Sequence, residues 1–173
     1  NSGARILTSP QALDVIESGE ADPADPQFGM HDPMHPIARH LVSAIEPGEV
    51  VTLLGRDFLP VATPGHTPGA LTWQWQDCEA GECRSVVYAD SLSAVSSDHY
   101  RFSDHPDYVQ AYRDGLARLA ALDCDVLLTP HPSASHMRDK LLAGDLAGGM
   151  TCAAYAADRL ARLEQRLAQE AAQ

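Results

Sequence analysis

The sequence lacks several features that would define its class immediately. It has no apolar run near the roughly 18 residues that a membrane-spanning helix needs. It does not open with a basic region followed by an apolar one, so we expect no signal peptide within this chain. Basic residues are scarce, with 12 Lys and Arg against 24 Asp and Glu and a formal net charge of −12. Nucleic acids and anionic membrane surfaces are bound through Lys and Arg, so we expect neither as a partner.

The remaining composition is that of a folded domain. The 173 residues are 45% hydrophobic and 21% charged, which suits a single unit with its own core. We find no internal repeat and no linker between domains. Composition alone leaves open an enzyme or a binding module.

The four cysteines include no Cys-x-x-Cys pair, which argues against a zinc ribbon or a thioredoxin-type site. An even number of cysteines fits two disulfides and an oxidising compartment. Cys78 and Cys83 flank a predicted turn, and a bridge between them would hold that turn. Four reduced, buried thiols in a cytosolic protein are the alternative.

Local patterns predict strands and helices in mixed order. Ser9 and Pro10 suit the start of a helix that runs to Ser18 and stops at Gly19. Further helices are expected from Pro106, over 137–142 and from residue 152 to the end. Strands are expected over residues 4–8, 50–54, 58–62, 70–76, 84–89 and 125–129, with turns at 55–57 and 78–83. Residues 20–47 are expected to form a long loop with at most one short helical turn. This order predicts a layered α/β or α+β domain.

Two histidines occupy equivalent places in the predicted fold. His66 lies in Thr-Pro-Gly-His-Thr-Pro-Gly and His131 in Thr-Pro-His-Pro, each just after a predicted strand. Prolines fix φ and glycines allow close backbone approach, so both imidazoles would be presented from stiff turns, as metal ligands are. The alternative is that each histidine merely fits its turn.

A third polar group follows another predicted strand. Asp90, Ser91 and Ser93 place one carboxylate and two hydroxyls where a metal, a substrate carboxylate or a substrate carbonyl could bind. The alternative is that Asp90 and Ser91 only cap backbone N–H groups.

Together these segments resemble the metallo-β-lactamase superfamily. Residues 65–69, Gly-His-Thr-Pro-Gly, resemble its Gly-His-Thr-x-Gly motif. Residues 89–94 and 127–132 resemble the next two motifs of one branch, the subclass B3 metallo-β-lactamases. Cys124 and Cys152 fall where that branch carries a disulfide, and Cys78 with Cys83 resembles an extra bridge of some members. The resemblance extends from Ala4 to about Tyr155.

The resemblance implies an α/β fold, the four-layer αββα sandwich, with two zinc ions at the edge of its two sheets. It makes His66 a ligand of the first zinc and His131 a ligand of the second. Ser91 and Ser93 would orient the carboxylate of a β-lactam. The attacking group would be a zinc-bound hydroxide, so no serine nucleophile is expected.

The implied function is zinc-dependent hydrolysis of the amide bond of penicillins, cephalosporins and carbapenems, which gives antibiotic resistance. The expected protein is a monomer in the periplasm that acts on a small-molecule substrate. Phe28, Met30, Met34 and Ile37 would form an apolar lip of the cleft. His40, His99, His105 and His136 are expected to be structural or surface residues.

One motif of the family is absent from the sequence. The other zinc ligands of the family lie in a His-x-His-x-Asp-His motif, and no such motif occurs here. We therefore expect residues 1–173 to be the C-terminal portion of a single metallo-β-lactamase domain, inactive alone because two imidazoles cannot complete a tetrahedral site.

Two other functions stay open at this stage. One is another hydrolase of the superfamily, a glyoxalase-II-like thioesterase or a lactonase, in which Asp90 would bridge the metals. The other is a non-catalytic binding module, if the chain is complete.

Overall fold

The computed structural model describes residues 3–172, and its strands form two sheets. In the small sheet, β1 (Ile6–Thr8) and β2 (Val42–Ala44) are parallel. The large sheet has five strands in chain order: β3 (Val51–Leu53), β4 (Arg56–Ala62), β5 (Leu71–Glu79), β6 (Glu82–Tyr88) and β7 (Val126–Leu128). Neighbouring strands of the large sheet are antiparallel except β6 and β7, which are parallel.

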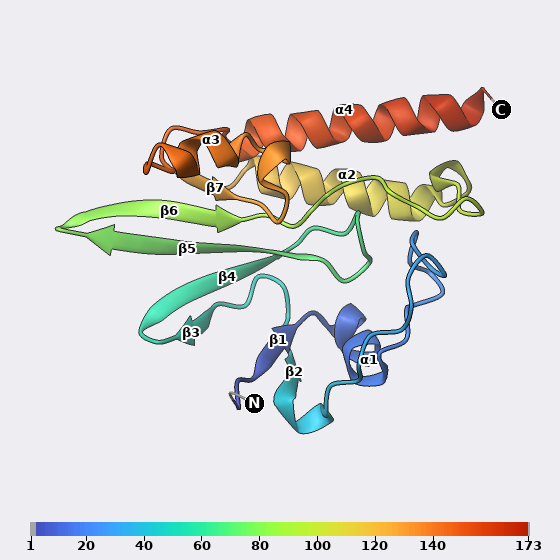
Figure 1. Ribbon diagram of the computed structural model, residues 1–173, viewed down its shortest axis with the longest axis horizontal. Helices are drawn as coiled ribbons and strands as arrows, with labels where there is room; N and C mark the ends of the chain where they lie inside the picture. Colours follow the sequence, from blue (N-terminus) through green and yellow to red (C-terminus); the bar gives the residue numbers. More distant parts are fainter. Residues whose placement is uncertain (1–2, 173) are drawn as a thin grey trace.

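Residues 3–172 also form four α-helices. They are α1 (Pro10–Ser18), α2 (Pro106–Ala120), α3 (Met137–Leu142) and α4 (Cys152–Ala171). Three short 3₁₀ turns cover Arg39–Leu41, Phe102–Asp104 and Pro132–Ala134. Figure 1 shows α2 and α4 side by side along the large sheet, with α1 and the small sheet at the other end of the molecule. None of the described helices combines the length and the apolarity needed to cross a membrane.

Helix ends follow the residues that the sequence offers for them. The Ser9 hydroxyl accepts a hydrogen bond from the Ala12 N–H at the start of α1, and Gly19 ends that helix with φ 78°. The Thr151 hydroxyl accepts in the same way from the Ala154 N–H at the start of α4. The predicted bounds of α1 and α3 are confirmed.

Both hairpin turns are shorter than the sequence suggested. The turns consist of Leu54-Gly55 and Ala80-Gly81, and all four residues have positive φ, between 51° and 89°. A two-residue turn of this kind matches the twist of the strands, so pairing continues up to it. Arg56 is therefore a strand residue rather than part of a turn at 55–57. Likewise the turn predicted at 78–83 shrinks to two residues, and Cys78 lies opposite Cys83 in the ladder.

Strand β2 was missed by the sequence analysis, which expected a long loop over 20–47. Val42 pairs with Ile6 of β1, directly after the 3₁₀ turn Arg39–Leu41. A strand of three residues is too short to show a two-residue period, so its sequence carries no signal. Within residues 20–38 the structure has turns and extended chain, as expected.

The core lies between the large sheet and the pair α2 and α4. Val87 and Leu127 face the helices from β6 and β7, and side chains of the two helices close the cluster: Val109, Tyr112, Leu116, Leu119, Tyr155 and Leu163. A disulfide between the partly buried Cys124 and the buried Cys152 ties the start of α4 to the chain just before β7. The second disulfide, between Cys78 and Cys83, crosses the β5–β6 hairpin.

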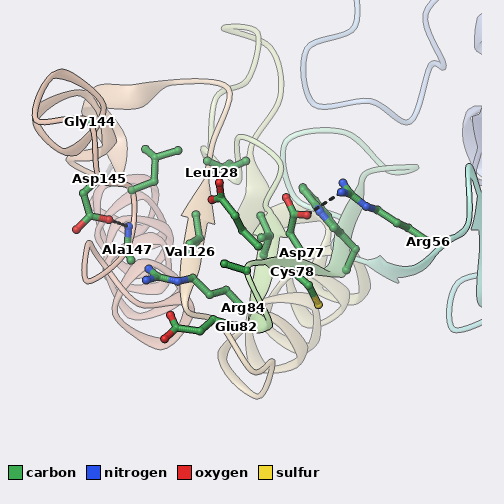
Figure 2. Close-up of a pocket in the computed structure, with 15 residues that line it drawn as sticks. Arg56, Asp77, Cys78, Glu82, Arg84, Val126, Leu128, Gly144, Asp145 and Ala147 are labelled. Atoms are coloured by element: carbon green, nitrogen blue, oxygen red, sulfur yellow. Dashed lines mark hydrogen bonds and ion pairs between the residues drawn. The ribbon is translucent and has the colours of Figure 1, made fainter.

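The opposite face of the large sheet borders a cavity. Because side chains alternate along a strand, Val86, Val126 and Leu128 point away from the helices. With Trp75 and the turn at 144–147 they line a wide cavity of about 930 Å³ (Figure 2). This face therefore combines apolar strand residues with charged side chains such as Arg56, Asp77 and Arg84 around the cavity.

Candidate active site

Three loops leave the large sheet at the same edge. Ala62 at the end of β4 pairs with Leu71 at the start of β5, and Trp73 of β5 pairs with Tyr88 at the end of β6. Tyr88 in turn pairs with the last residue of β7. The loops that follow β4, β6 and β7 therefore begin side by side, and they carry the predicted site residues His66, Asp90 to Ser93, and His131.

The loop that carries His66 is packed closely against two helices. A Cβ added at Gly65 would lie 2.5 Å from the Tyr112 ring of α2, and one added at Gly69 would lie 2.7 Å from the Ser9 hydroxyl. Only glycine fits at either place without a shift. The Gln27 side-chain amide donates to the His66 carbonyl at 3.0 Å. These contacts fix the backbone on both sides of the histidine.

The His66 ring is oriented by the neighbouring loop. Its Nδ1 lies 3.3 Å from the Ser93 carbonyl oxygen, to which it donates in the tautomer that carries the proton there. That tautomer leaves Nε2 with a free lone pair. Histidines that bind metals commonly donate their second ring nitrogen to a backbone carbonyl in this way. The contact therefore suits His66 as a metal ligand.

His131 is held through its backbone rather than through its ring. The buried Thr129 hydroxyl donates to the His131 carbonyl at 3.1 Å, and the Ser135 hydroxyl lies 2.7 Å from the Thr129 hydroxyl. Because Thr129 gives its proton to the carbonyl, Ser135 is the donor in that pair. The His131 side chain itself is exposed at the end of β7.

The two serines differ in accessibility. Ser91 is buried, and its hydroxyl donates to the Ser93 hydroxyl at 3.2 Å. Ser93 is partly exposed, and its hydroxyl donates back to the Ser91 carbonyl at 3.4 Å. Asp90 is also partly exposed, and its carbonyl accepts from Tyr155 at 3.4 Å. Ser93 and Asp90 are thus the members of this loop that can meet a ligand directly.

The two histidines are suitable zinc ligands, but they are too few to complete a zinc site. Imidazole nitrogen is an ordinary zinc ligand, and four ligands complete a tetrahedral site. Within residues 3–172, no group of three or more His, Cys, Asp and Glu side chains could hold a metal ion. His66 and His131 can each provide one ligand from this edge, and further ligands are needed.

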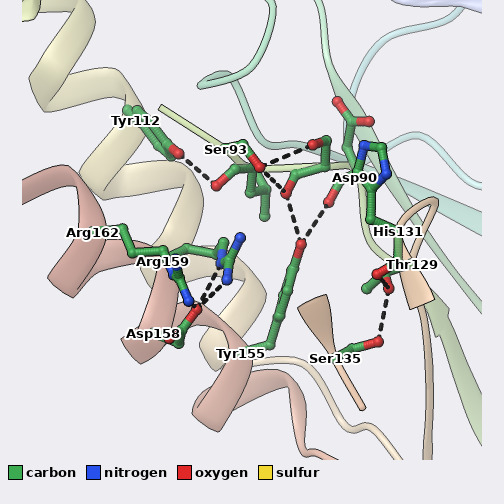
Figure 3. A network of polar contacts seen from close by, with 12 residues as sticks. Asp90, Ser93, Tyr112, Thr129, His131, Ser135, Tyr155, Asp158, Arg159 and Arg162 are labelled. Atoms are coloured by element: carbon green, nitrogen blue, oxygen red, sulfur yellow. Dashed lines mark hydrogen bonds and ion pairs between the residues drawn. The ribbon is translucent and has the colours of Figure 1, made fainter. Parts of the chain in front are cut away.

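Sequence analysis missed the polar groups that support these loops. Tyr108 donates to the Gly65 carbonyl at 3.2 Å, Tyr112 to the Leu92 carbonyl at 2.6 Å and Tyr155 to the Ser91 carbonyl at 2.7 Å (Figure 3 shows the last two). Tyr112 belongs to the buried core, and Tyr108 packs against that core from a partly buried position. The available signal was their hydroxyl, because a buried tyrosine O–H usually finds a partner.

One acidic side chain of the 20–38 segment also faces this region. Burial raises the pKa of Asp25, while its own hydrogen bond from the Gln27 N–H and the nearby His66 lower it. Gln27 thereby links Asp25 to the His66 carbonyl. The segment is thus connected to the histidine loop through polar contacts.

Comparison with solved structures identifies relatives of the chain. It superposes on the metallo-β-lactamase MIM-1 from Novosphingobium pentaromativorans with a TM-score of 0.90 and 42% identity, covering 98% of this chain and 62% of MIM-1. With the metallo-β-lactamase MIM-2 the TM-score is 0.87 and the identity 49%, and the match covers 98% of this chain and 61% of MIM-2. With MEM-A1, a subclass B3 metallo-β-lactamase isolated from a soil metagenome library, the TM-score is 0.90 and the identity 36%. This match covers 99% of this chain and 67% of MEM-A1. No known protein-family profile matches the chain.

These similarities place the chain in a class and then in a branch of it. Its fold is that of the metallo-β-lactamases, a family of hydrolases. Within that family the chain belongs to subclass B3. It spans about three fifths to two thirds of the length of these relatives. The resemblance predicted from residues 65–69, 89–94 and 127–132 is thereby confirmed.

Proposed function

We propose that the complete protein is a zinc-dependent β-lactamase that hydrolyses the amide bond of penicillins, cephalosporins and carbapenems and so gives antibiotic resistance. The observation that carries this proposal is the His66 ring, whose Nδ1 faces the Ser93 carbonyl and whose Nε2 is left free to bind a metal. This ring lies in a subclass B3 chain, at the sheet edge that also carries Asp90 and His131.

We propose that this chain is the C-terminal portion of a single domain. It spans 62% of MIM-1, and Val86, Val126 and Leu128 of its large sheet line a cavity of about 930 Å³ together with charged side chains (Figure 2). Burying the apolar side chains of this face against further chain is favourable, because moving apolar surface out of water lowers the free energy. The other zinc ligands would come from that part of the domain.

Each residue of the site has a separate task in this proposal. His66 would hold the first zinc and His131 the second, and the partly exposed Ser93 hydroxyl would turn from the Ser91 carbonyl to donate to the β-lactam carboxylate. Zinc, when bound, lowers the pKa of a coordinated water towards about 7 and so supplies hydroxide near neutral pH. The Ser91 hydroxyl is buried and donates to the Ser93 hydroxyl rather than to a base that could make it a nucleophile, so both serines are assigned to binding.

An apolar lip beside the His66 loop suits a drug-sized substrate. Phe28, Met30 and Met34 are 49%, 42% and 47% exposed. Phe28 and Met34 line a cavity of about 360 Å³ that reaches Thr67, the residue after His66. Methionine side chains adapt to ligands of different shape, which suits several β-lactam classes.

A related enzyme supports the zinc assignment. SMB-1, 40% identical to this chain, has been solved bound to 2-mercaptoethanesulfonate, and a second structure shows it with mercaptoacetic acid. Both small molecules pair a thiol, which binds zinc as the thiolate, with an acidic group. We therefore expect mercaptoacetic acid to compete with a β-lactam for this site.

The test is metal-dependent hydrolysis by the natural protein as it is encoded. Purified protein is assayed against a penicillin, a carbapenem and a thioester, before and after a chelator and again after added Zn²⁺. The proposal predicts β-lactam opening that the chelator abolishes and zinc restores. Thioester hydrolysis faster than β-lactam opening would replace this function with that of another hydrolase of the fold. Activity that survives removal of all metal would refute zinc dependence.

We propose a location in the periplasm, because the two disulfides suit an oxidising compartment. We also propose that the protein is a monomer. Alkylation of the natural protein without a reductant is expected to leave all four cysteines unlabelled. Labelling of Cys124 or Cys152 would contradict an oxidising compartment. Light scattering of the purified protein gives its oligomeric state directly.

A further inference from the structure

The loop between β6 and α2 contains a backbone conformation that needs support. Leu92 has φ 47°, in the left-handed region that leucine rarely adopts, and its side chain is fully buried. Backbone strain of this kind persists only where the surroundings over-determine it, and it occurs often at functional sites. Leu92 stands between Ser91 and Ser93, the two serines of the site.

Two buried tyrosines hold this conformation from the helix layer. The Tyr112 hydroxyl of α2 donates to the Leu92 carbonyl at 2.6 Å, and the Tyr155 hydroxyl of α4 donates to the Ser91 carbonyl at 2.7 Å. Figure 3 shows both side chains reaching the loop from their helices. The two tyrosines are 0% and 1% exposed, so neither hydroxyl has water as an alternative partner.

Both hydroxyls are protonated at any ordinary pH. Burial raises the pKa of Tyr155 to about 12, although Arg159 over its ring acts in the opposite direction. Burial raises the pKa of Tyr112 still further. Both tyrosines are therefore permanent donors to the loop.

The conformation of Leu92 also determines where the Ser93 carbonyl lies relative to His66. The next carbonyl after Leu92 belongs to Ser93, and it is the acceptor that faces His66 Nδ1 at 3.3 Å. A change of φ at Leu92 would turn the peptide planes on either side and displace that carbonyl. The contacts thus run from two helices through two hydroxyls and one strained residue to the ring of a metal ligand.

We infer that Tyr112 and Tyr155 are positioning residues that lock Leu92 in its left-handed conformation and thereby aim the Ser93 carbonyl at His66, which sets the zinc affinity of that histidine. This inference rests on the function proposed above. Neither tyrosine touches the metal or the substrate. Their effect is exerted entirely through the backbone of residues 91–93.

The test uses Tyr112→Phe, Tyr155→Phe and the double variant of the natural protein, because phenylalanine keeps the packed ring and removes only the donor. Tyr100→Phe is the matched control, since it removes a hydroxyl from a partly buried tyrosine whose ring stacks on His105. Two quantities are measured: amide hydrogen exchange over residues 90–96 in zinc-free protein, and the zinc dissociation constant by competition with a chromophoric chelator.

We expect the double variant to exchange faster over residues 90–96 while α2 and α4 stay protected, and to bind zinc roughly 10- to 100-fold more weakly, the usual effect of losing partners that orient a metal ligand. Tyr100→Phe is expected to match the parent. A double variant with the exchange and zinc affinity of the parent would overturn the inference, as would a loss of protection spread evenly over the whole chain. If the parent binds no zinc, the proposed function fails separately, and hydrogen exchange still decides whether the tyrosines lock the loop.

Discussion

Gly65 shows how tightly the histidine loop fits the rest of the molecule. A methyl group at this position would meet the Tyr112 ring at 2.5 Å. We expect Gly65→Ala to lower the free energy of unfolding by about 1–3 kcal/mol, as overpacking of a filled site does, and to weaken zinc binding because the His66 backbone must move.

Gly149→Ala is the matched control for this substitution. A Cβ at Gly149 would meet the Lys140 side chain at 3.6 Å, which is ordinary contact. Its effect is expected to stay within about 0.5 kcal/mol. Both values come from chemical denaturation of the natural protein, and a Gly65→Ala variant as stable as the control would contradict the packing argument.

Individual residues also show how far the sequence alone could predict the site. His66 and His131 stand out because prolines and glycines surround them at the ends of strands. Tyr112 does not, because its helical spacing marks it only as a core residue, and its hydroxyl acts on a loop 20 positions away. Nor does the sequence distinguish Ser91 from Ser93, although the structure buries the first and leaves the second accessible.

At the scale of elements, the C-terminal end of α4 is fastened to the chain that precedes α2. Glu170 is 3% exposed, and its carboxylate accepts from the Phe102 and Ser103 N–H groups and from Arg166. Burial acts to raise the pKa of Glu170, but these hydrogen bonds outweigh it and hold the pKa below its ordinary value of 4.5.

The lowered pKa of Glu170 predicts that the fold loses stability in acid. The stabilisation by Glu170 is fully present above the unfolded pKa, near 4.5, and is lost as pH falls through the lower folded pKa. We expect Glu170→Gln to cost about 1–3 kcal/mol at pH 7 and to lose less stability than the parent below pH 4.5. Thermal unfolding between pH 3 and 7 measures both effects.

Glu164→Gln on the same helix is the control for Glu170→Gln. Glu164 is half exposed, and it pairs with Arg113 at 2.8 Å. An exposed ion pair of this kind contributes at most about 1 kcal/mol. Equal losses of unfolding free energy in the two variants would show that the burial of Glu170 adds nothing to the stability of the fold.

The two disulfides should differ in their contribution to stability. Cys78 and Cys83 are 5 positions apart at an exposed hairpin, while Cys124 and Cys152 are 28 positions apart and Cys152 is buried. Loop-closure entropy then predicts losses of about 2 and about 3.6 kcal/mol for the two double alanine variants. Urea unfolding of both variants tests the order, and a larger loss at the hairpin would contradict it.

The ends of the helices depend on local residues, whereas the short strand β2 depends on distant ones. Helix ends were predictable because Ser9, Gly19 and Thr151 act locally. Strand β2 was not, because its three residues are ordered by pairing with β1, more than thirty positions earlier in the chain.

At the scale of the whole molecule, zinc is expected to stabilise the fold. A ligand that binds only the folded state adds RT ln(1 + [L]/Kd), which is about 2.7 kcal/mol at a hundredfold excess over Kd. We expect Zn²⁺ to raise the melting temperature of the natural protein and to raise it much less in a His66→Ala, His131→Ala variant.

His40→Ala, at an exposed histidine in the 3₁₀ turn Arg39–Leu41 and outside the three site loops, is the control for this measurement. It should keep the full zinc effect on the melting temperature. A zinc effect that persists undiminished in the double variant would place the metal elsewhere.

In the proposed function, the loops after β4 and β7 bring His66 and His131 to two neighbouring zinc ions. An anomalous difference map of the natural protein, recorded at the zinc absorption edge, tests it most directly. We expect two peaks about 3.5–4 Å apart, the first next to His66 Nε2 and the second next to a ring nitrogen of His131. Zinc-loaded crystals with no peak at either ring, or with the two imidazoles turned into separate interiors, would contradict it.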